Sequence, residues 1–152
     1  MKKQQIVIII MSFIGSFVFG QKTSCNINSA GVAIKGYDVV SYFDNKASKG
    51  KSKYTYTYKE VKYKFATKEN LEKFKANPTK YLPQYGGWCA YAMGTKGEKV
   101  EMDPKVFEIR DDKLYLFYTG FFTNTYKKWK DEGPEKLKQK ANVNWKKMEA
   151  KK

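Results

Sequence analysis

Two stretches of alternating polar and apolar residues predict β-hairpins. Over residues 53–65, aromatic and β-branched side chains recur at every second position, which is typical of strands with one buried face. Residues 106–109 and 114–118 are two short apolar runs on either side of the turn-forming sequence Asp111-Asp112-Lys113. The sequence therefore predicts an antiparallel strand pair at each place. The first turn, near Lys59-Glu60, has no glycine, so its register stays open.

Other segments show the three-to-four-residue spacing of helices. Thr67 is a candidate N-cap for a helix from Lys68 to about Ala76, which Asn77-Pro78 ends because the residue before proline avoids the helical region. Asp38 is a candidate N-cap for one short helical turn. These signals predict short helices between and beside the strands.

The C-terminal third is expected to be helical from Phe121 onward. Phe122, Tyr126 and Trp129 lie four and three residues apart, and Pro134 suits the first turn of a last helix. Lysines dominate the other face of that last helix, whose apolar positions are Leu137, Ala141, Trp145 and Met148. The predicted fold class is α+β, with a small, mostly antiparallel sheet, packed short helices and a basic C-terminal helix.

The N-terminus is typical of a bacterial secretory signal. Lys2 and Lys3 precede an apolar run over residues 6–19, and small residues favour cleavage before Gln21. An uncleaved membrane anchor is the alternative, but the run is shorter than the roughly 20 residues that a spanning helix needs. We expect residues 1–20 to be a signal peptide, 21–30 a flexible leader, 31–149 one domain and 150–152 a tail. The expected location is the periplasm or the exterior.

Composition excludes several classes of chemistry. The chain has 152 residues, of which 41% are hydrophobic and 16% aromatic, enough for the core of one domain. It contains no histidine, which removes His-based acid–base catalysis, Ser-His-Asp and Cys-His pairs, and His-ligated zinc or haem. Paired aspartates occur only where a turn is predicted, and no phosphate-binding loop is present.

The basic charge is carried almost entirely by lysine. Loss of Lys2 and Lys3 with the signal peptide lowers the formal net charge from +15 to +13, and Arg110 is the single arginine. Nucleic-acid sites favour arginine for its bidentate geometry, so we expect no nucleic-acid partner. A lysine surface fits a solvated face that also attracts anionic envelope polymers or an envelope protein.

Several segments in the same order resemble the YHS-domain family, in its exported single-domain bacterial branch. The resemblance covers roughly residues 31–145 and is strongest over residues 80–92 (KYLPQYGGWCAYA). The other segments are residues 36–43 (GYDVVSYF), 63–66 (YKFA), Asn70 with 74–78 (FKANP), 103–104 and 114–116, followed by Trp129 and Trp145. It implies a small α+β module of a family suspected of binding metal, found alone or fused to metal-handling proteins. The chain lacks the histidine of the family's name and the closely spaced cysteines of its metal-binding relatives.

Cys89 is the residue with the most distinctive chemistry. The alternation of small and large residues after Gly86-Gly87 fits either a strand or a short helix. Alanine favours the helix, which would place Tyr85, Cys89 and Met93 on one face. Cysteine and methionine are ligands that copper(I) prefers, and cysteine and tyrosine also ligate haem iron. The candidate pocket therefore comprises Tyr85, Trp88, Cys89, Tyr91 and Met93. Alternatively, Cys89 is a small buried hydrophobe among aromatic side chains.

Two further alternatives stay open. Export permits a Cys25–Cys89 disulfide, which would compete with a metal at Cys89. Tyr54, Tyr56, Tyr58 and Tyr63 either pack the core with their hydroxyls at its edge or form a ligand platform.

The sequence favours a non-enzymatic exported module that binds a metal ion or a metal-containing cofactor. An envelope interaction module without a cofactor is the second hypothesis. A thiol enzyme at Cys89 is the third, and neither a C-x-x-C motif nor an adjacent base supports it.

Overall fold

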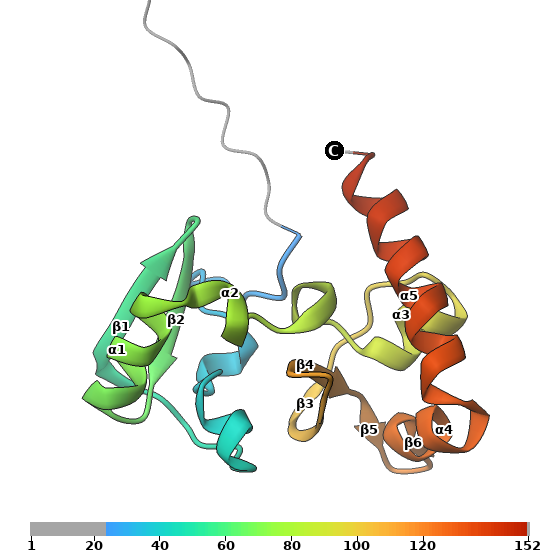
Figure 1. Ribbon diagram of the computed structural model, residues 1–152, viewed down its shortest axis with the longest axis horizontal. Helices are drawn as coiled ribbons and strands as arrows, with labels where there is room; N and C mark the ends of the chain where they lie inside the picture. Colours follow the sequence, from blue (N-terminus) through green and yellow to red (C-terminus); the bar gives the residue numbers. More distant parts are fainter. Residues whose placement is uncertain (1–23, 152) are drawn as a thin grey trace, which may run out of the picture.

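The computed structural model describes residues 24–151, so the expected signal peptide over residues 1–20 lies outside the described residues (Figure 1). Five α-helices lie in this part of the chain, together with three short 3-10 helices, η1 (Ile34–Gly36), η2 (Ser41–Asp44) and η3 (Gln84–Gly87). The α-helices are α1 (Lys68–Ala76), α2 (Pro78–Tyr81), α3 (Ala90–Thr95), α4 (Thr125–Glu132) and α5 (Pro134–Glu149). The expected α+β class is confirmed, and α5 is the expected basic C-terminal helix.

The strands form three separate antiparallel pairs instead of the single small sheet that we expected. They are β1 (Lys51–Tyr58) with β2 (Val61–Phe65), β3 (Asp103–Arg110) with β4 (Lys113–Phe117), and β5 (Thr119–Gly120) with β6 (Thr123–Asn124). Both predicted hairpins are confirmed. The two turns are Lys59-Glu60 (φ 47° and 65°) and Asp111-Asp112 (φ 50° and 58°), and neither contains glycine. All four residues have a left-handed backbone conformation, which matches the twist of the flanking strands in a two-residue hairpin turn.

Strand β4 lies between two hydrophobic clusters and contributes to both. Its alternate residues point in opposite directions, so Leu114 and Leu116 enter the first cluster while Tyr115 and Phe117 enter the second. The first cluster joins the β1–β2 hairpin, α1 and residues 33–42, and the second joins α3, α4 and α5. The protein therefore has two adjoining cores that share one buried strand.

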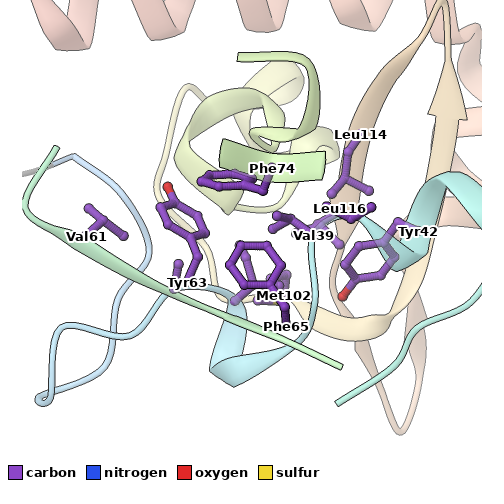
Figure 2. Close-up of a cluster of buried hydrophobic side chains, with 12 residues drawn as sticks. Val39, Tyr42, Val61, Tyr63, Phe65, Phe74, Met102, Leu114 and Leu116 are labelled. Carbon is purple, nitrogen blue, oxygen red and sulfur yellow. The ribbon is translucent and has the colours of Figure 1, made fainter. Parts of the chain in front are cut away.

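Phe74 of α1 is the centre of the aromatic packing in the first cluster. Its ring centroid lies 5.0 Å from that of Tyr63 and 5.1 Å from that of Phe65, and Figure 2 shows these three rings grouped beside β2. Helix α1 begins as predicted, because the Thr67 side chain accepts a hydrogen bond from the Asn70 amide at 3.1 Å. The cap fixes where the helix starts, and the Phe74 ring fixes which face is buried.

The predicted helical pattern from Phe121 onward is wrong for its first residues. Phe121 and Phe122 form the two-residue turn between β5 and β6, and the helix begins only at Thr125. The Asn124 side chain caps α4 by accepting from the Lys127 amide at 2.9 Å. From Tyr126 onward the helical expectation is confirmed, with Pro134 in the first turn of α5 and Leu137 and Ala141 buried.

The expected flexible leader is also corrected, because residues 24–30 pack against the domain. The Asn26 amide donates to the Gly86 carbonyl at 2.8 Å, and Ile27 pairs with Ala33 in a short antiparallel bridge. The Asn28 side chain accepts from the Ala30 and Val32 amides, both at 3.0 Å. Small polar residues suggested disorder, but here they supply the hydrogen bonds of a compact turn.

An ion-pair network joins the β3–β4 turn to α5 and makes a testable contribution to stability. Lys138 lies 2.7 Å from Asp111 and 2.6 Å from Glu135, which lowers the pKa of both carboxyl groups, first through hydrogen bonds from Lys138. A carboxyl group whose pKa is lowered in the folded state stabilises the fold at pH values above its unfolded-state pKa, about 4. This stabilisation is lost as the pH falls through the folded-state pKa. We expect Lys138→Met to lower the unfolding free energy at pH 7 and to have little effect below pH ~3.

Denaturant titration at both pH values measures this difference. Lys136→Met on the same helix is the matched control, because Lys136 is exposed and makes no ion pair within residues 24–151. A Lys138→Met effect of equal size at both pH values would contradict the electrostatic account.

Candidate functional site

The segment around Cys89 is not the helix that the sequence favoured. Residues 84–87 form η3, in which Tyr85, Gly86 and Gly87 all have positive φ, and α3 begins only at Ala90. Cys89 itself precedes α3 as its N-cap, with φ −56° and ψ 117°. Left-handed backbone at three consecutive residues interrupts a helix whatever the propensity of the alanines that follow. Tyr85, Cys89 and Met93 therefore do not share a helical face.

Cys89 is a buried structural residue. It is 0% exposed, and its Sγ accepts a hydrogen bond from the Tyr118 amide at 3.3 Å. The Thr125 hydroxyl lies 3.4 Å from Sγ and gives its one proton to the Tyr118 carbonyl at 2.6 Å. The thiol is therefore the donor to Thr125. A thiol with 0% exposure and satisfied hydrogen bonds has no route to a substrate.

The other four candidate residues have separate roles. Tyr85 and Met93 are buried in the second cluster, and the Tyr85 hydroxyl donates to Asn142 Oδ1 at 2.9 Å. Trp88 donates from Nε1 to the Ser24 carbonyl at 2.7 Å. Tyr91 lies at the edge of the second cluster and donates to Glu132 at 2.8 Å.

A copper(I) ion or haem does not fit this set of residues. The polar atoms of the Tyr85, Cys89 and Tyr91 side chains each face a different partner. These partners are Asn142 on α5, Thr125 at the start of α4 together with Tyr118, and Glu132 at the end of α4. Met102, the next methionine after Met93 in the sequence, does not join Met93 as a ligand, because it belongs to the first cluster and Met93 to the second. A metal site needs ligands that converge on one point. Within residues 24–151, no group of three His, Cys, Asp or Glu side chains is placed to hold an ion.

The Cys25–Cys89 disulfide is not formed in the described structure. Cys89 is turned into its hydrogen bonds with Tyr118 and Thr125, whereas Cys25 lies in the wall of a surface cleft. The two cysteines therefore have different environments, and Cys25 belongs to the site that the sequence did not indicate.

The main candidate site is a cleft of about 250 Å³ between the β1–β2 hairpin and the C-terminal part of α5. Figure 1 shows these two elements on opposite sides, with the start of the described chain between them. Segments distant in sequence line the cleft, namely Ser24, Cys25, Tyr58, Lys59, Val61, Tyr63, Leu82, Pro83, Gly86, Trp145 and Glu149.

Gly86 allows the walls of this cleft to meet. Its φ of +60° is a conformation that side chains disfavour, and a Cβ there would lie 3.1 Å from the Cys25 Cα, the Ser24 carbonyl oxygen and the Trp145 ring. The absence of a side chain thus brings the N-terminal segment and α5 into contact. The Asn26–Gly86 backbone hydrogen bond, 2.8 Å long, holds this approach.

Ser24 is the unusual polar group of the cleft. The residue is 4% exposed, and its hydroxyl has no hydrogen-bond partner within the described structure. Nearly all buried hydroxyls in folded proteins have a partner, so an unpaired one requires an explanation, and a molecule bound from outside the chain supplies one. No other buried side-chain nitrogen or oxygen of residues 24–151 shares this property.

The remaining walls are mainly neutral. Burial, followed by the neighbouring Cys25 and Tyr58, raises the pKa of Tyr63, so this phenol stays protonated at neutral pH. Trp145, Leu82 and Pro83 add apolar surface, and Lys59 and Glu149 carry opposite charges. Such a lining suits an uncharged ligand with apolar surface.

Comparisons with known proteins give no functional assignment. No family model, curated protein or solved structure matches the chain. Among residues 24–151, none of the helices combines the length and the apolarity needed to span a bilayer.

Proposed function

We propose that the protein is an exported, non-enzymatic binding module of the YHS-like type, whose ligand occupies the cleft at Ser24, Tyr63 and Trp145. The unpaired, buried Ser24 hydroxyl is the observation that carries the proposal. The assignment to export and to a YHS-like module rests on the N-terminal pattern and on the ordered motifs of residues 36–92.

The cleft favours a small aromatic molecule with one polar group. Its volume, about 250 Å³, is below the roughly 300–1,000 Å³ of sites for drug-sized ligands. Rings of Tyr58, Tyr63 and Trp145 offer edges and faces for a further ring. A hydroxyl on the ligand would pair with Ser24 and remove the cost of its unpaired burial.

Phenol and toluene test this proposal, because they have nearly the same shape and differ in one hydroxyl. We expect phenol to bind with a Kd on the order of 1 mM, as suits a ligand of few atoms. Ser24→Ala should reduce the preference for phenol over toluene by about 5-fold, the effect of one hydrogen bond. Ligand-observed NMR on the chain beginning at Gln21, which retains both hydrophobic clusters, measures the two constants.

Cys89→Ala is the control variant, because Cys89 lies outside the cleft and should leave both affinities unchanged. Ser24→Ala should not lower the free energy of unfolding, since the removed hydroxyl has no partner. Equal weakening of phenol and toluene by Ser24→Ala, or no binding of either compound, would overturn the proposal.

A further inference from the structure

The tip of the β5–β6 hairpin exposes two phenylalanine side chains. Phe121 is 94% exposed and Phe122 is 93% exposed, and their ring centroids lie 4.7 Å apart in an edge-to-face contact. Gly120 and Thr123 pair on either side of them, so both phenylalanines occupy the turn itself. Tyr118, 36% exposed, packs over Gly120 and extends the aromatic surface. Full exposure of two adjacent large apolar side chains requires an explanation.

The size and shape of this tip disfavour a conventional protein interface. Two phenylalanine side chains offer roughly 300–500 Å², against the roughly 800 Å² that each partner contributes to a stable complex. The rings also project from a turn, whereas protein interfaces are broad. A convex apolar tip instead suits insertion into a deformable layer, and a lipid bilayer is such a layer.

A cationic hollow adjoins the tip. Lys96 and Lys128 line a surface depression of about 310 Å³ together with Thr95, Thr123 and Thr125, and Thr123 directly follows Phe122 in the chain. Lys96 and Lys128 make no ion pair within residues 24–151, and the Lys128 ammonium lies 6.0 Å from the centre of the Tyr91 ring. The Thr95 and Thr125 hydroxyls donate to the Tyr91 and Tyr118 carbonyls, which leaves the Thr123 hydroxyl and the two cations as donors to a phosphate oxyanion.

We propose that this end of the molecule docks on an anionic phospholipid membrane. Phe121 and Phe122 enter the interface between headgroups and acyl chains, while Lys96, Lys128 and the Thr123 hydroxyl contact a lipid phosphate. An apolar anchor with adjacent lysines supplies the two signals that stable peripheral binding needs. The net charge of the chain, +13 without residues 1–20, adds long-range attraction to the same surface.

The docked orientation leaves the ligand cleft accessible. Figure 1 shows the β5–β6 hairpin at one end of the molecule and the C-terminal end of α5 at the other. The cleft residues Trp145 and Glu149 belong to that distant part of α5. Membrane docking is therefore independent of the ligand proposed above, and either proposal can fail alone.

Vesicle co-sedimentation tests the docking. The chain beginning at Gln21 is mixed with vesicles of phosphatidylcholine alone or of phosphatidylcholine with phosphatidylglycerol, so that residues 1–20 contribute nothing. We expect binding to the mixed vesicles, weakened about 10-fold or more by F121S/F122S. Val143→Ser, at an exposed apolar residue on α5, should leave binding unchanged. All these positions are exposed, and near-ultraviolet circular dichroism verifies the fold.

A second pair of variants separates the hollow from the general positive charge. K96Q/K128Q should weaken binding to the mixed vesicles about 10-fold, whereas K46Q/K68Q, exposed lysines of the other half, should change it less than about 2-fold. Inorganic phosphate in excess competes for the hollow but does not replace the inserted rings, so it should weaken vesicle binding no more than K96Q/K128Q does.

Three results would overturn the docking proposal. The first is that F121S/F122S binds the mixed vesicles as tightly as the parent protein. The second is that both lysine pairs lose vesicle affinity equally. The third is binding to dextran sulfate that depends on the same residues, without binding to vesicles. A dimer in sedimentation velocity that F121S/F122S abolishes, without vesicle binding, would assign the tip to self-association instead.

Discussion

Replacing Asp38 with alanine is expected to lower the free energy of unfolding by about 4 kcal/mol. Asp38 is 0% exposed, and its carboxylate accepts four hydrogen bonds. Oδ1 accepts from the Val40 and Ser41 amides at 2.9 and 3.3 Å, and Oδ2 accepts from the Ala66 amide and the Asn70 side chain at 2.8 and 2.7 Å. The carboxylate thus ties residues 40–41 to the end of β2 and to α1.

The expected loss is large because alanine leaves buried donors without an acceptor, at about 1–3 kcal/mol each before relaxation. Asp38→Asn should also destabilise, since its amide NH₂ would face the donors on Ala66 or on Val40. Asp44→Ala, at an exposed acid in η2, is the matched control and should change stability by less than about 0.5 kcal/mol. Denaturant unfolding measures all three. An Asp38→Ala effect as small as that of Asp44→Ala would contradict this role.

Phe74→Ala is expected to cost about 3–5 kcal/mol, the usual range for a buried phenylalanine. The side chain is 0% exposed, and its ring also meets Tyr56 and Tyr58 edge-on at centroid distances of 6.3 and 6.0 Å. Alanine would leave a cavity among these rings, and the surrounding side chains relax only partially into such a cavity.

Phe74→Leu provides a graded comparison and should cost less than Phe74→Ala, because leucine refills part of the volume. Val143→Ala on the exposed face of α5 is the surface control. Thermal and denaturant unfolding measure the series. Similar stabilities of Phe74→Ala and the parent protein would show that the first cluster does not hold the hairpin against α1.

Local signals predicted the elements whose ends are set by neighbouring residues. The Thr67 cap, the Asn77-Pro78 stop and Pro134 each act within a few residues, and the corresponding helices begin or end there. The Asp111-Asp112 turn likewise depends on its own backbone conformation. The alternation over residues 53–65 predicted a hairpin because one face of it packs on Phe74.

Predictions failed where distant contacts determine the structure. The spacing of Phe122, Tyr126 and Trp129 fits a helix, but the chain pairs Gly120 with Thr123 and turns before α4 begins. Alanine propensity favoured a short helix after Gly86-Gly87, and α3 forms there only from Ala90 onward, whereas Tyr85, Gly86 and Gly87 have positive φ and lie outside any α-helix. Asp38 was predicted as a local cap, and its carboxylate does accept from the Val40 and Ser41 amides. Its further bonds to Ala66 and Asn70 depend on the folded chain and were not predicted.

The candidate cleft could not be predicted from the sequence, because no single segment carries it. Its walls come from residues 24–25, 58–63, 82–86 and 145–149, which only the two adjoining cores bring together. Cys89 was a candidate ligand because of its residue type, but its thiol group is hydrogen-bonded to Thr125 and to the Tyr118 amide within the protein. Ser24 stands out because its buried hydroxyl has no hydrogen-bond partner within the described residues, and this property cannot be predicted from the sequence.

Mapping the phenol site by ¹H–¹⁵N NMR tests the central claim most directly. The claim is that the ligand site of this protein lies between the β1–β2 hairpin and α5, and not around Cys89. Phenol added to the chain beginning at Gln21 should shift the Cys25 and Gly86 amide signals and the Trp145 indole signal most strongly. Largest shifts at Cys89, Tyr118 and Thr125, or no localised shifts, would contradict it.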